Sequence, residues 1–381
     1  MKVGIVVPFS WSFWGGVVDH ADSQARALQR LGVDARLIMG NDPPGLLTRM
    51  LHPRPGRHDP PPDYVIPIGR SVIVPANSSL ANIVLSPSSL VRLRRLFWRE
   101  QFDVVHVHEP LAPILSAYAV YAAPSRIVTT SHASGGRWFP VGRLAWGRAF
   151  EHRIDHRIAV SEQARVAAAP YLRGPYEIIP NGVELPETFS TGGRLHQVLF
   201  VGRHEPRKGL QVLLKAWPEI AQATGARLRV VGADPLQVRF LLRRLGVPDD
   251  SIDILGVVPT SQLQEELCAA KALVAPSIRG ESFGMVLTQA FSHATPVVAS
   301  AIPGYTDVVD DSCGVLVPPG EEQALAAGIV GLLRDEPARQ ALGAAGRARA
   351  EERYGWDPIA LRLAGIYELL TGLRIPARVA A

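Results

Sequence analysis

Residues 272–290 read ALVAPSIRGESFGMVLTQA, and this segment shows most directly how the chain is built. Its first five residues, Ala272 to Pro276, form a short apolar run that predicts a buried parallel strand. From Gly284 to His293 the apolar residues have the spacing of a helix. The loop between them therefore opens onto a helix N-terminus, where free backbone N–H groups and the positive end of the helix dipole favour an anion.

Two side chains of this segment are candidate ligand contacts. Glu281 can accept hydrogen bonds from sugar hydroxyls, and Gln289 lies roughly 10 Å further along the helix, within reach of a ribose. Gly280 and Gly284 allow the backbone to approach the ligand closely. The spacing fits a nucleotide sugar. The alternative is that Glu281 only complements the helix dipole and that Gln289 lies on a solvated face.

The same segment resembles the signature of the retaining glycosyltransferases of family four, in which two glutamates are separated by seven residues and the first precedes Ser/Ala-Phe-Gly. Here Glu281, Ser282, Phe283 and Gly284 match the first half, and Gln289 replaces the second glutamate. The resemblance extends along the chain and points to the phosphatidylinositol α-mannosyltransferase group. It implies that these five residues bind the nucleotide sugar and that Glu281 takes part in catalysis.

Length and composition favour two soluble domains. The chain has 381 residues, of which 47% are hydrophobic, which is sufficient for two cores. Its net charge of +5 suits anionic substrates or an anionic membrane surface, and we expect no nucleic-acid partner. Cys268 and Cys313 fit neither a metal site nor a disulfide framework. We therefore expect a cytoplasmic protein that is peripheral at the inner face of the plasma membrane.

The N-terminal part begins with a predicted strand, Val3 to Val7, and a helix from Gly16. Gly15 and Gly16 lie at the turn between them, where they either let a diphosphate or sugar approach the backbone or simply form a turn. The family resemblance favours the first interpretation. Pro43 to Pro62 contains seven prolines, which predicts an exposed loop.

Polar residues follow two further predicted strands, Phe102 to Val107 and Arg126 to Ser131. The first is followed by His108-Glu109-Pro110 and the second by His132. Ligands bind at the carboxyl ends of strands in open parallel sheets, so His132 is a candidate catalytic residue, although a lone histidine is more often structural. In the family, the histidine at this position contacts the donor sugar near the reacting carbon.

Ser89 to Glu100 predicts a basic amphipathic helix. Its apolar side carries Leu93 and Phe97, and its other side carries Arg92, Arg95 and Arg99. Either the arginines are a solvated face, or they bind anionic lipid headgroups. The phosphatidylinositol mannosyltransferases have a basic membrane-docking helix here.

A second alternation of strands and helices begins at Gln197 to Val201. The following motif, residues 202–209, contains Arg203 and Lys208, which can offset the diphosphate charge that builds as the sugar leaves. This motif resembles the donor-phosphate motif of the family. At the strand ends we recognise no Asp-x-Asp pair that would hold a metal ion, so we expect neither a metal nor another cofactor.

These patterns predict an α/β protein of the GT-B class, with two doubly wound Rossmann-like domains facing each other across a cleft. We expect an acceptor-binding domain over residues 1–182 and a donor-binding domain over 183–357. By analogy with the fold, a final helix at about 358–381 should cross back to the first domain.

The resemblance implies a metal-independent transferase that moves a hexose, with GDP-mannose the favoured donor, to a lipid or polyol acceptor. The alternative is a non-catalytic nucleotide-sugar or lipid-binding protein on the same scaffold. Four positions differ from the polar or basic acceptor contacts of the mannosyltransferases: Val18, Asn82, Leu111 and Ala133. Since Asn82 lacks the charge of an arginine, we expect that the acceptor need not be phosphatidylinositol.

Overall fold

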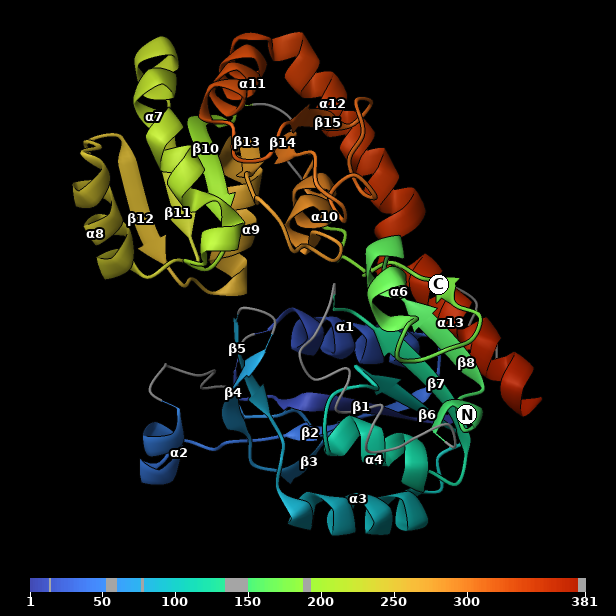
Figure 1. Ribbon diagram of the computed structural model, residues 1–381. Coiled ribbons are helices and arrows are strands. Elements are labelled where there is room, and N and C mark those ends of the chain that lie inside the picture. The colour runs from blue at the N-terminus through green and yellow to red at the C-terminus, as the bar shows by residue number, and fades with distance from the viewer. Residues whose placement is uncertain (14, 53–59, 77–78, 134–149, 188–192, 376–381) are drawn as a thin grey trace. The chain divides into compact units, whose positions relative to one another are not determined.

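The computed structural model divides the chain into two compact units, and each is described by itself (Figure 1). The first contains residues 1–182 together with 356–381, and the second contains 183–355. The structure describes all residues except 14, 53–59, 77–78, 134–149, 188–192 and 376–381.

The first unit is built on a sheet with the strand order β3-β2-β1-β6-β7-β8-β9, in which neighbours are parallel. A β4–β5 hairpin joins it where β5 pairs antiparallel with β1. The strands are β1 (Lys2–Ser10), β2 (Asp34–Gly40), β3 (Val65–Gly69), β4 (Val72–Ala76), β5 (Ser79–Ile83), β6 (Val104–His108), β7 (Arg126–Ser131), β8 (His156–Ala159) and β9 (Glu177–Ile178).

Helices cover both faces of this sheet, because its central strands are apolar on both sides. Figure 1 shows α1 and α13 on one face and α3 and α4 on the other, and each pair packs into its own apolar cluster. The helices of this unit are α1 (Gly16–Arg30), α2 (Leu46–Leu51), α3 (Pro87–Glu100), α4 (Leu115–Ala122), α6 (Glu162–Ala168) and α13 (Trp356–Thr371).

The second unit contains an entirely parallel six-stranded sheet with the order β12-β11-β10-β13-β14-β15. Its strands are β10 (Leu195–Val201), β11 (Arg227–Val231), β12 (Ile252–Gly256), β13 (Ala270–Ala275), β14 (Val297–Ser300) and β15 (Gly314–Val317). Its helical elements are η1 (Pro206–Lys208), α7 (Leu210–Thr224), α8 (Pro235–Leu245), α9 (Thr260–Ala269), α10 (Met285–Ser292), α11 (Glu322–Arg334), α12 (Glu336–Arg349) and η2 (Ala350–Tyr354). The order places the ends of β10 and β13, which carry the two predicted donor motifs, next to each other.

The predicted fold class of two doubly wound parallel sheets is confirmed. One local prediction is wrong: the segment Pro43 to Pro62 is not only loop, since α2 forms within it. Its prolines flank this short helix instead of lying inside it, so the helix keeps its backbone hydrogen bonds. The strand predicted to end at Val107 continues to His108. Within the part of the chain that the structure describes, no helix has the length and apolar character needed to cross a bilayer.

Candidate functional site

Glu281 lies at the centre of a charged cluster in the second unit. Its Oε1 is 2.8 Å from Lys208 Nζ and 2.8 Å from Arg207 Nη1, and it accepts a hydrogen bond of 3.1 Å from Ser277 Oγ. Glu281 is 8% exposed, so burial of its charge would be costly without these partners. The loops after β10 and β13 thus bring together two of the residues that the sequence singled out, Lys208 and Glu281.

Arg203 joins the same cluster through a residue that the sequence analysis missed. Glu205 lies 3.0 Å from Arg203 Nη2 and 2.9 Å from Arg207 Nη2, and so connects the exposed Arg203 to the partly buried Arg207. The five side chains carry three positive and two negative charges, which leaves the cluster cationic. The alternating charges of residues 203–208 are the signal that could have identified Glu205 and Arg207.

The backbone brings the two loops very close together. Gly209 has φ of +70°, and a Cβ built there would lie 1.8 Å from the carbonyl oxygen of Pro276. In addition, Ile278 N donates a hydrogen bond of 2.8 Å to Arg207 O. Only glycine fits at position 209, since any side chain would push the two motifs apart.

Helix α10 begins directly after the Glu281 loop, as the sequence predicts. Gly284 is its N-cap residue with φ of +88°, and a Cβ there would meet the ring of Tyr305 at 2.7 Å. Tyr305 is buried and pairs its hydroxyl with Ser277 Oγ at 2.9 Å, and burial raises its pKa. This tyrosine, which the sequence analysis missed, therefore packs against the Glu281 loop at Ser277 and Gly284.

The other predicted donor contacts differ in exposure. Phe283 is buried and meets the ring of Tyr354 edge-on at 5.6 Å, which gives it a packing role. Ser282 is partly buried in the loop, and Gln289 is partly buried on the second turn of α10. Gln289 thus lies on the helix that starts at the charged cluster.

The predicted catalytic histidine, His132, belongs to the first unit, where it lies directly after β7. It is buried, and its Nε2 is 2.8 Å from Nδ1 of His108, the last residue of the neighbouring strand β6. His106 lies two residues before His108, and its ring forms hydrogen bonds of 2.6 Å with the hydroxyls of Thr130 and Tyr367. The parallel pairing of β6 and β7 aligns these rings at one sheet edge.

Burial keeps these histidines neutral. It lowers the pKa of His132 to about 4 and that of His106 to about 3, and the pKa values of His20 and His108 also fall well below 6.5. Charging any of these closely spaced rings would also repel its neighbours. His132 is therefore suited to hydrogen bonding and not to carrying a positive charge near neutral pH.

Among the described residues, His20, His108 and His132 are the one group of ligand-type side chains close enough to hold a metal ion, with ring nitrogens within 4.8 Å of one another. The hydrogen bond between His108 and His132 argues against that role. One ring donates and the other accepts, so the accepting ring must carry its proton on its outer nitrogen. Only one of the two outer nitrogens then has a lone pair, and binding all three rings would require breaking the bond.

Glu109 fixes the backbone that carries His132. Its Oε1 accepts a hydrogen bond of 2.8 Å from His132 N, and its own backbone has φ of +49°. Such a conformation costs energy for a residue with a side chain, and such outliers cluster at functional sites. Burial raises the pKa of Glu109 to about 7. The position of Glu109 after a predicted strand did not by itself indicate this role.

The predicted glycine pair lies at the start of α1. Gly15 is the N-cap residue, and a Cβ built on it would meet one atom within 4 Å, Val18 Cγ2 at 3.9 Å. Packing therefore does not require glycine here, and the open space is available to a ligand. Gly16, the first residue of α1, is exposed.

The four positions that differ from the mannosyltransferase acceptor contacts have different surroundings. Val18 and Leu111 are buried in the apolar clusters on the two faces of the sheet. Asn82 is partly buried and pairs its Oδ1 with His52 Nδ1 at 3.0 Å, and Ala133 is partly buried. Asn82 Oδ1 is thus already bound within the protein.

Helix α3 presents the basic surface predicted from the sequence. Leu93 and Phe97 are buried, whereas Arg92, Arg95 and Arg99 are exposed. A shallow depression on this surface is lined by Val91, Arg94, Arg95, Trp98 and Arg99. Arg94 and the exposed Trp98 were missed, and the aromatic ring makes this surface amphipathic.

Comparison with known proteins identifies relatives over the whole chain. Residues 14–187 match the family model described as Glycosyltransferase Family 4, and residues 196–335 match the model described as Glycosyl transferases group 1. The chain is 35% identical to a phosphatidyl-myo-inositol mannosyltransferase of Mycobacterium leprae over 97% of this chain and 96% of that protein. It is 32% identical to the protein of the same name from Mycolicibacterium smegmatis, over 100% and 96% of the two chains.

Solved structures share the fold at lower identity. A sucrose-phosphate synthase from Thermosynechococcus elongatus superposes with a TM-score of 0.71 at 21% identity, covering 97% of this chain and 99% of that chain. The Anabaena protein HepE in complex with UDP has a TM-score of 0.69 at 19% identity, covering 97% and 100%. These neighbours have the GT-B fold, as the sequence predicts.

Proposed function

The chain belongs to glycosyltransferase family 4, and from this premise we propose that it is a retaining, metal-independent transferase that moves a hexose from a nucleoside diphosphate sugar to a lipid or polyol acceptor. The observation that carries the proposal is the cationic cluster of Arg203, Lys208 and Glu281 beside the N-terminus of α10. Fixed cations and free helix N–H groups together suit a diphosphate.

In this proposal the second unit binds the donor. Arg203 and Lys208 stabilise the negative charge that develops on the diphosphate while the bond between it and the sugar carbon breaks. The acceptor hydroxyl forms its bond to that carbon on the same face, and its proton passes to the leaving phosphate. Glu281 orients the sugar hydroxyls and holds Lys208 in place, so positioning and electrostatics supply the rate enhancement.

The first unit provides His132 and the acceptor surface. His132, held neutral and fixed by His108 and Glu109, offers a hydrogen-bonding contact to the donor sugar in the role that the family resemblance implies. Gly15 leaves room for the ligand at the start of α1, and Gly16 follows it as an exposed residue. The acceptor is a hydroxyl of a lipid or polyol, and Asn82 offers an inositol phosphate none of the charge of an arginine.

The names of the relatives support mannose as the transferred sugar and a lipid as the acceptor. The basic surface of α3 supports the proposal that the protein acts at an anionic membrane surface. Near such a surface each arginine contributes about 1 kcal/mol, so binding to anionic liposomes should weaken as salt is added. Arg92→Ala/Arg95→Ala should reduce flotation with these liposomes, and equal flotation of variant and wild type would remove α3 from the proposal.

A donor screen followed by a transfer assay tests the activity. GDP-mannose should raise the Tm more than other nucleotide sugars and should yield labelled product with a lipid or polyol acceptor. Phosphatidylinositol, diacylglycerol and free polyols are compared side by side. Efficient mannosylation of phosphatidylinositol alone would refute the expectation that Asn82 disfavours an inositol phosphate. No Tm shift with any nucleotide sugar would refute the donor site.

A second function is favoured by Gln289, which replaces a glutamate of the family signature. A non-catalytic protein on this scaffold would bind a nucleotide sugar or a lipid without turning it over. The two functions are separated by incubation with labelled donors. Transfer or hydrolysis of any donor identifies an enzyme, whereas binding without either outcome identifies the non-catalytic protein.

A further inference from the structure

Helix α2 exposes its large apolar side chains to an unusual degree. Relative exposure is 71% for Leu46, 51% for Leu47, 73% for Met50 and 38% for Leu51, and no residue of the helix is buried. Pro43 and Pro44, just before it, are exposed as well. Contiguous apolar surface on a soluble protein commonly marks a binding site, whereas single exposed leucines do not.

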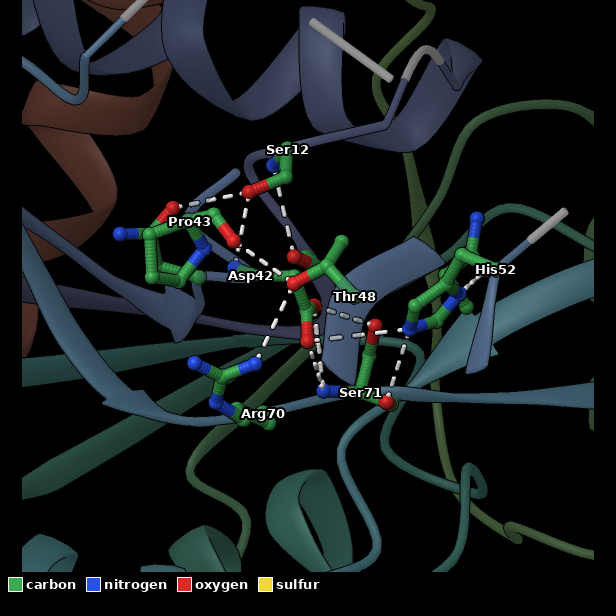
Figure 2. Close-up of polar contacts among 10 residues, drawn as sticks. Ser12, Asp42, Pro43, Thr48, His52, Arg70 and Ser71 are labelled. Atoms are coloured by element: carbon green, nitrogen blue, oxygen red, sulfur yellow. Dashed lines mark hydrogen bonds and ion pairs between the residues drawn. The ribbon is translucent and has the colours of Figure 1, made fainter. Parts of the chain in front are cut away.

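Buried polar contacts hold the chain just before this helix (Figure 2). Asp42 is almost fully buried and accepts hydrogen bonds from the hydroxyl of Ser71 at 2.6 Å and from Ser71 N at 3.2 Å. Its own N–H donates to Ser12 Oγ at 2.8 Å. The N-terminal side of α2 is thereby attached to the loops that follow β1 and β3.

The C-terminal side is fixed by His52, whose ring is also buried (Figure 2). Its Nε2 is 3.1 Å from Ser71 O, its Nδ1 is 3.0 Å from Asn82 Oδ1, and its ring lies 4.4 Å from that of Phe13. Asp42 and His52 therefore reach the same residue, Ser71, from the two ends of the helix.

Polar contacts also hold the helix itself. Thr48 Oγ1 donates to Pro43 O at 2.6 Å, and Arg70 Nη1 donates to Thr48 Oγ1 at 3.2 Å (Figure 2). A helix of six residues is marginal in water by itself. Since its leucines are exposed, the surrounding polar contacts, and not apolar burial, fix α2 with its apolar side chains facing outward.

We propose that α2 inserts its apolar side chains into the headgroup and upper acyl region of an anionic bilayer. The proposal deepens the proposed function, because it rests on action at a membrane. Arg49 is exposed within the helix, and Arg70 contacts the helix at Thr48. Two positive charges thus lie next to the apolar side chains, where they can bind lipid phosphates. Helix α3 of the same unit adds a second basic surface.

The size of the surface favours a bilayer over a protein partner. A stable protein interface uses about 20–30 residues from each side, whereas this apolar surface consists of four large side chains on one short helix. A bilayer requires no matching partner surface, and its affinity grows with each apolar side chain that enters it.

Insertion is tested with an environment-sensitive fluorophore. Met50→Cys in a Cys268→Ser background is labelled with NBD, while Cys313 stays unlabelled because it is buried and burial raises the pKa of its thiol. With vesicles of phosphatidylcholine and phosphatidylglycerol, NBD emission should shift to shorter wavelength and be quenched by brominated acyl chains. Leu369→Cys, at an 82% exposed position of α13, is the matched control and should give no shift. An unshifted signal at position 50 would overturn the proposal.

Partitioning gives the second measurement. Leu46→Ser/Met50→Ser should lower vesicle partitioning by about tenfold or more, because each removed side chain carries a substantial transfer free energy. Partitioning of the double variant should still depend on salt, since α3 is intact. The control variant Leu369→Ser should partition like wild type. If the double variant partitions as strongly as wild type, insertion is refuted. Insertion is also refuted if the wild-type protein forms a dimer and the double variant does not. Tm shifts with GDP-mannose, measured without vesicles, test the proposed function separately.

Discussion

Replacement of Lys208 by alanine tests whether the charged cluster of the second unit is the donor site. Lys208 Nζ lies 2.8 Å from Glu281, and the side chain is 19% exposed. Its removal leaves Arg207 and Ser277 as partners of Glu281, so the buried carboxylate keeps an ion pair and a hydrogen bond. We therefore expect the variant to fold.

The loss should appear in turnover. A hydrogen bond to a charged group contributes about 1.5–3 kcal/mol, and each 1.36 kcal/mol corresponds to a factor of ten in rate, so Lys208→Ala should lower kcat by roughly ten- to a hundredfold. The assay measures kcat and the donor KM with labelled donor, together with the Tm. Arginine in the variant Lys208→Arg restores the positive charge in a different geometry and should recover only part of the loss.

Lys215→Ala is the matched control. Lys215 forms an ion pair of similar length, 2.7 Å, with Glu322, but both side chains are about 40% exposed and lie on helices outside the cluster. Such a surface pair contributes little, so kcat should stay within about twofold of wild type. Wild-type turnover in Lys208→Ala would refute the donor-site assignment, and unfolding of that variant would show that its role is structural.

Three further changes test other parts of the site. Gln289→Glu should lower the donor KM by about tenfold with little change in kcat, because a ribose contact is similar in the ground and transition states; an unchanged KM would mean that Gln289 does not face the nucleotide. Gly209→Ala should lower both Tm and donor binding, because its Cβ would overlap the carbonyl of Pro276, and a wild-type Tm would contradict this packing. Since burial raises the pKa of Glu109 from 4.5 to about 7, its contribution to stability is present below about pH 4.5 and is lost as the pH rises through about 7. The Tm of Glu109→Gln relative to wild type should therefore rise between pH 5 and pH 8, and a constant difference would contradict the raised pKa.

The sequence predicted that the motifs containing Arg203, Lys208 and Glu281 follow strands of one parallel sheet, because these parts obey local rules. Apolar runs mark β10 and β13, and the motifs that contain Lys208 and Glu281 follow these strands directly. In a parallel sheet both strand ends lie at one edge, so the pairing of β10 with β13 brings the motifs together. The partners Glu205 and Tyr305 were missed, since which side chains meet across loops depends on backbone geometry that residue type does not reveal.

Helix α2 shows a different limit of sequence reasoning. Proline content predicts neither a long helix nor a central strand between Pro43 and Pro62, and residues 53–59 of this segment lie outside the described part of the chain. Six residues without proline are nevertheless enough for the one and a half turns of α2. What holds these turns in place are contacts of Asp42 and His52 with Ser71, some 20 to 30 residues away in sequence. Contacts between such distant polar residues have no periodic signature.

The candidate site residues are charged in the second unit and neutral in the first, and this contrast supports the different roles that we propose for the two units. In the second unit, Arg203, Arg207 and Lys208 surround two carboxylates and leave a positive surplus, which suits a diphosphate. In the first unit, burial holds His132 and its neighbours neutral, and the raised pKa of Glu109 reduces its charge near pH 7. Such neutral groups suit the hydrogen bond to an uncharged sugar hydroxyl that we propose for His132. The exchange of an arginine-type contact for Asn82 likewise fits the acceptor that we propose, a lipid or polyol hydroxyl that needs no cationic partner.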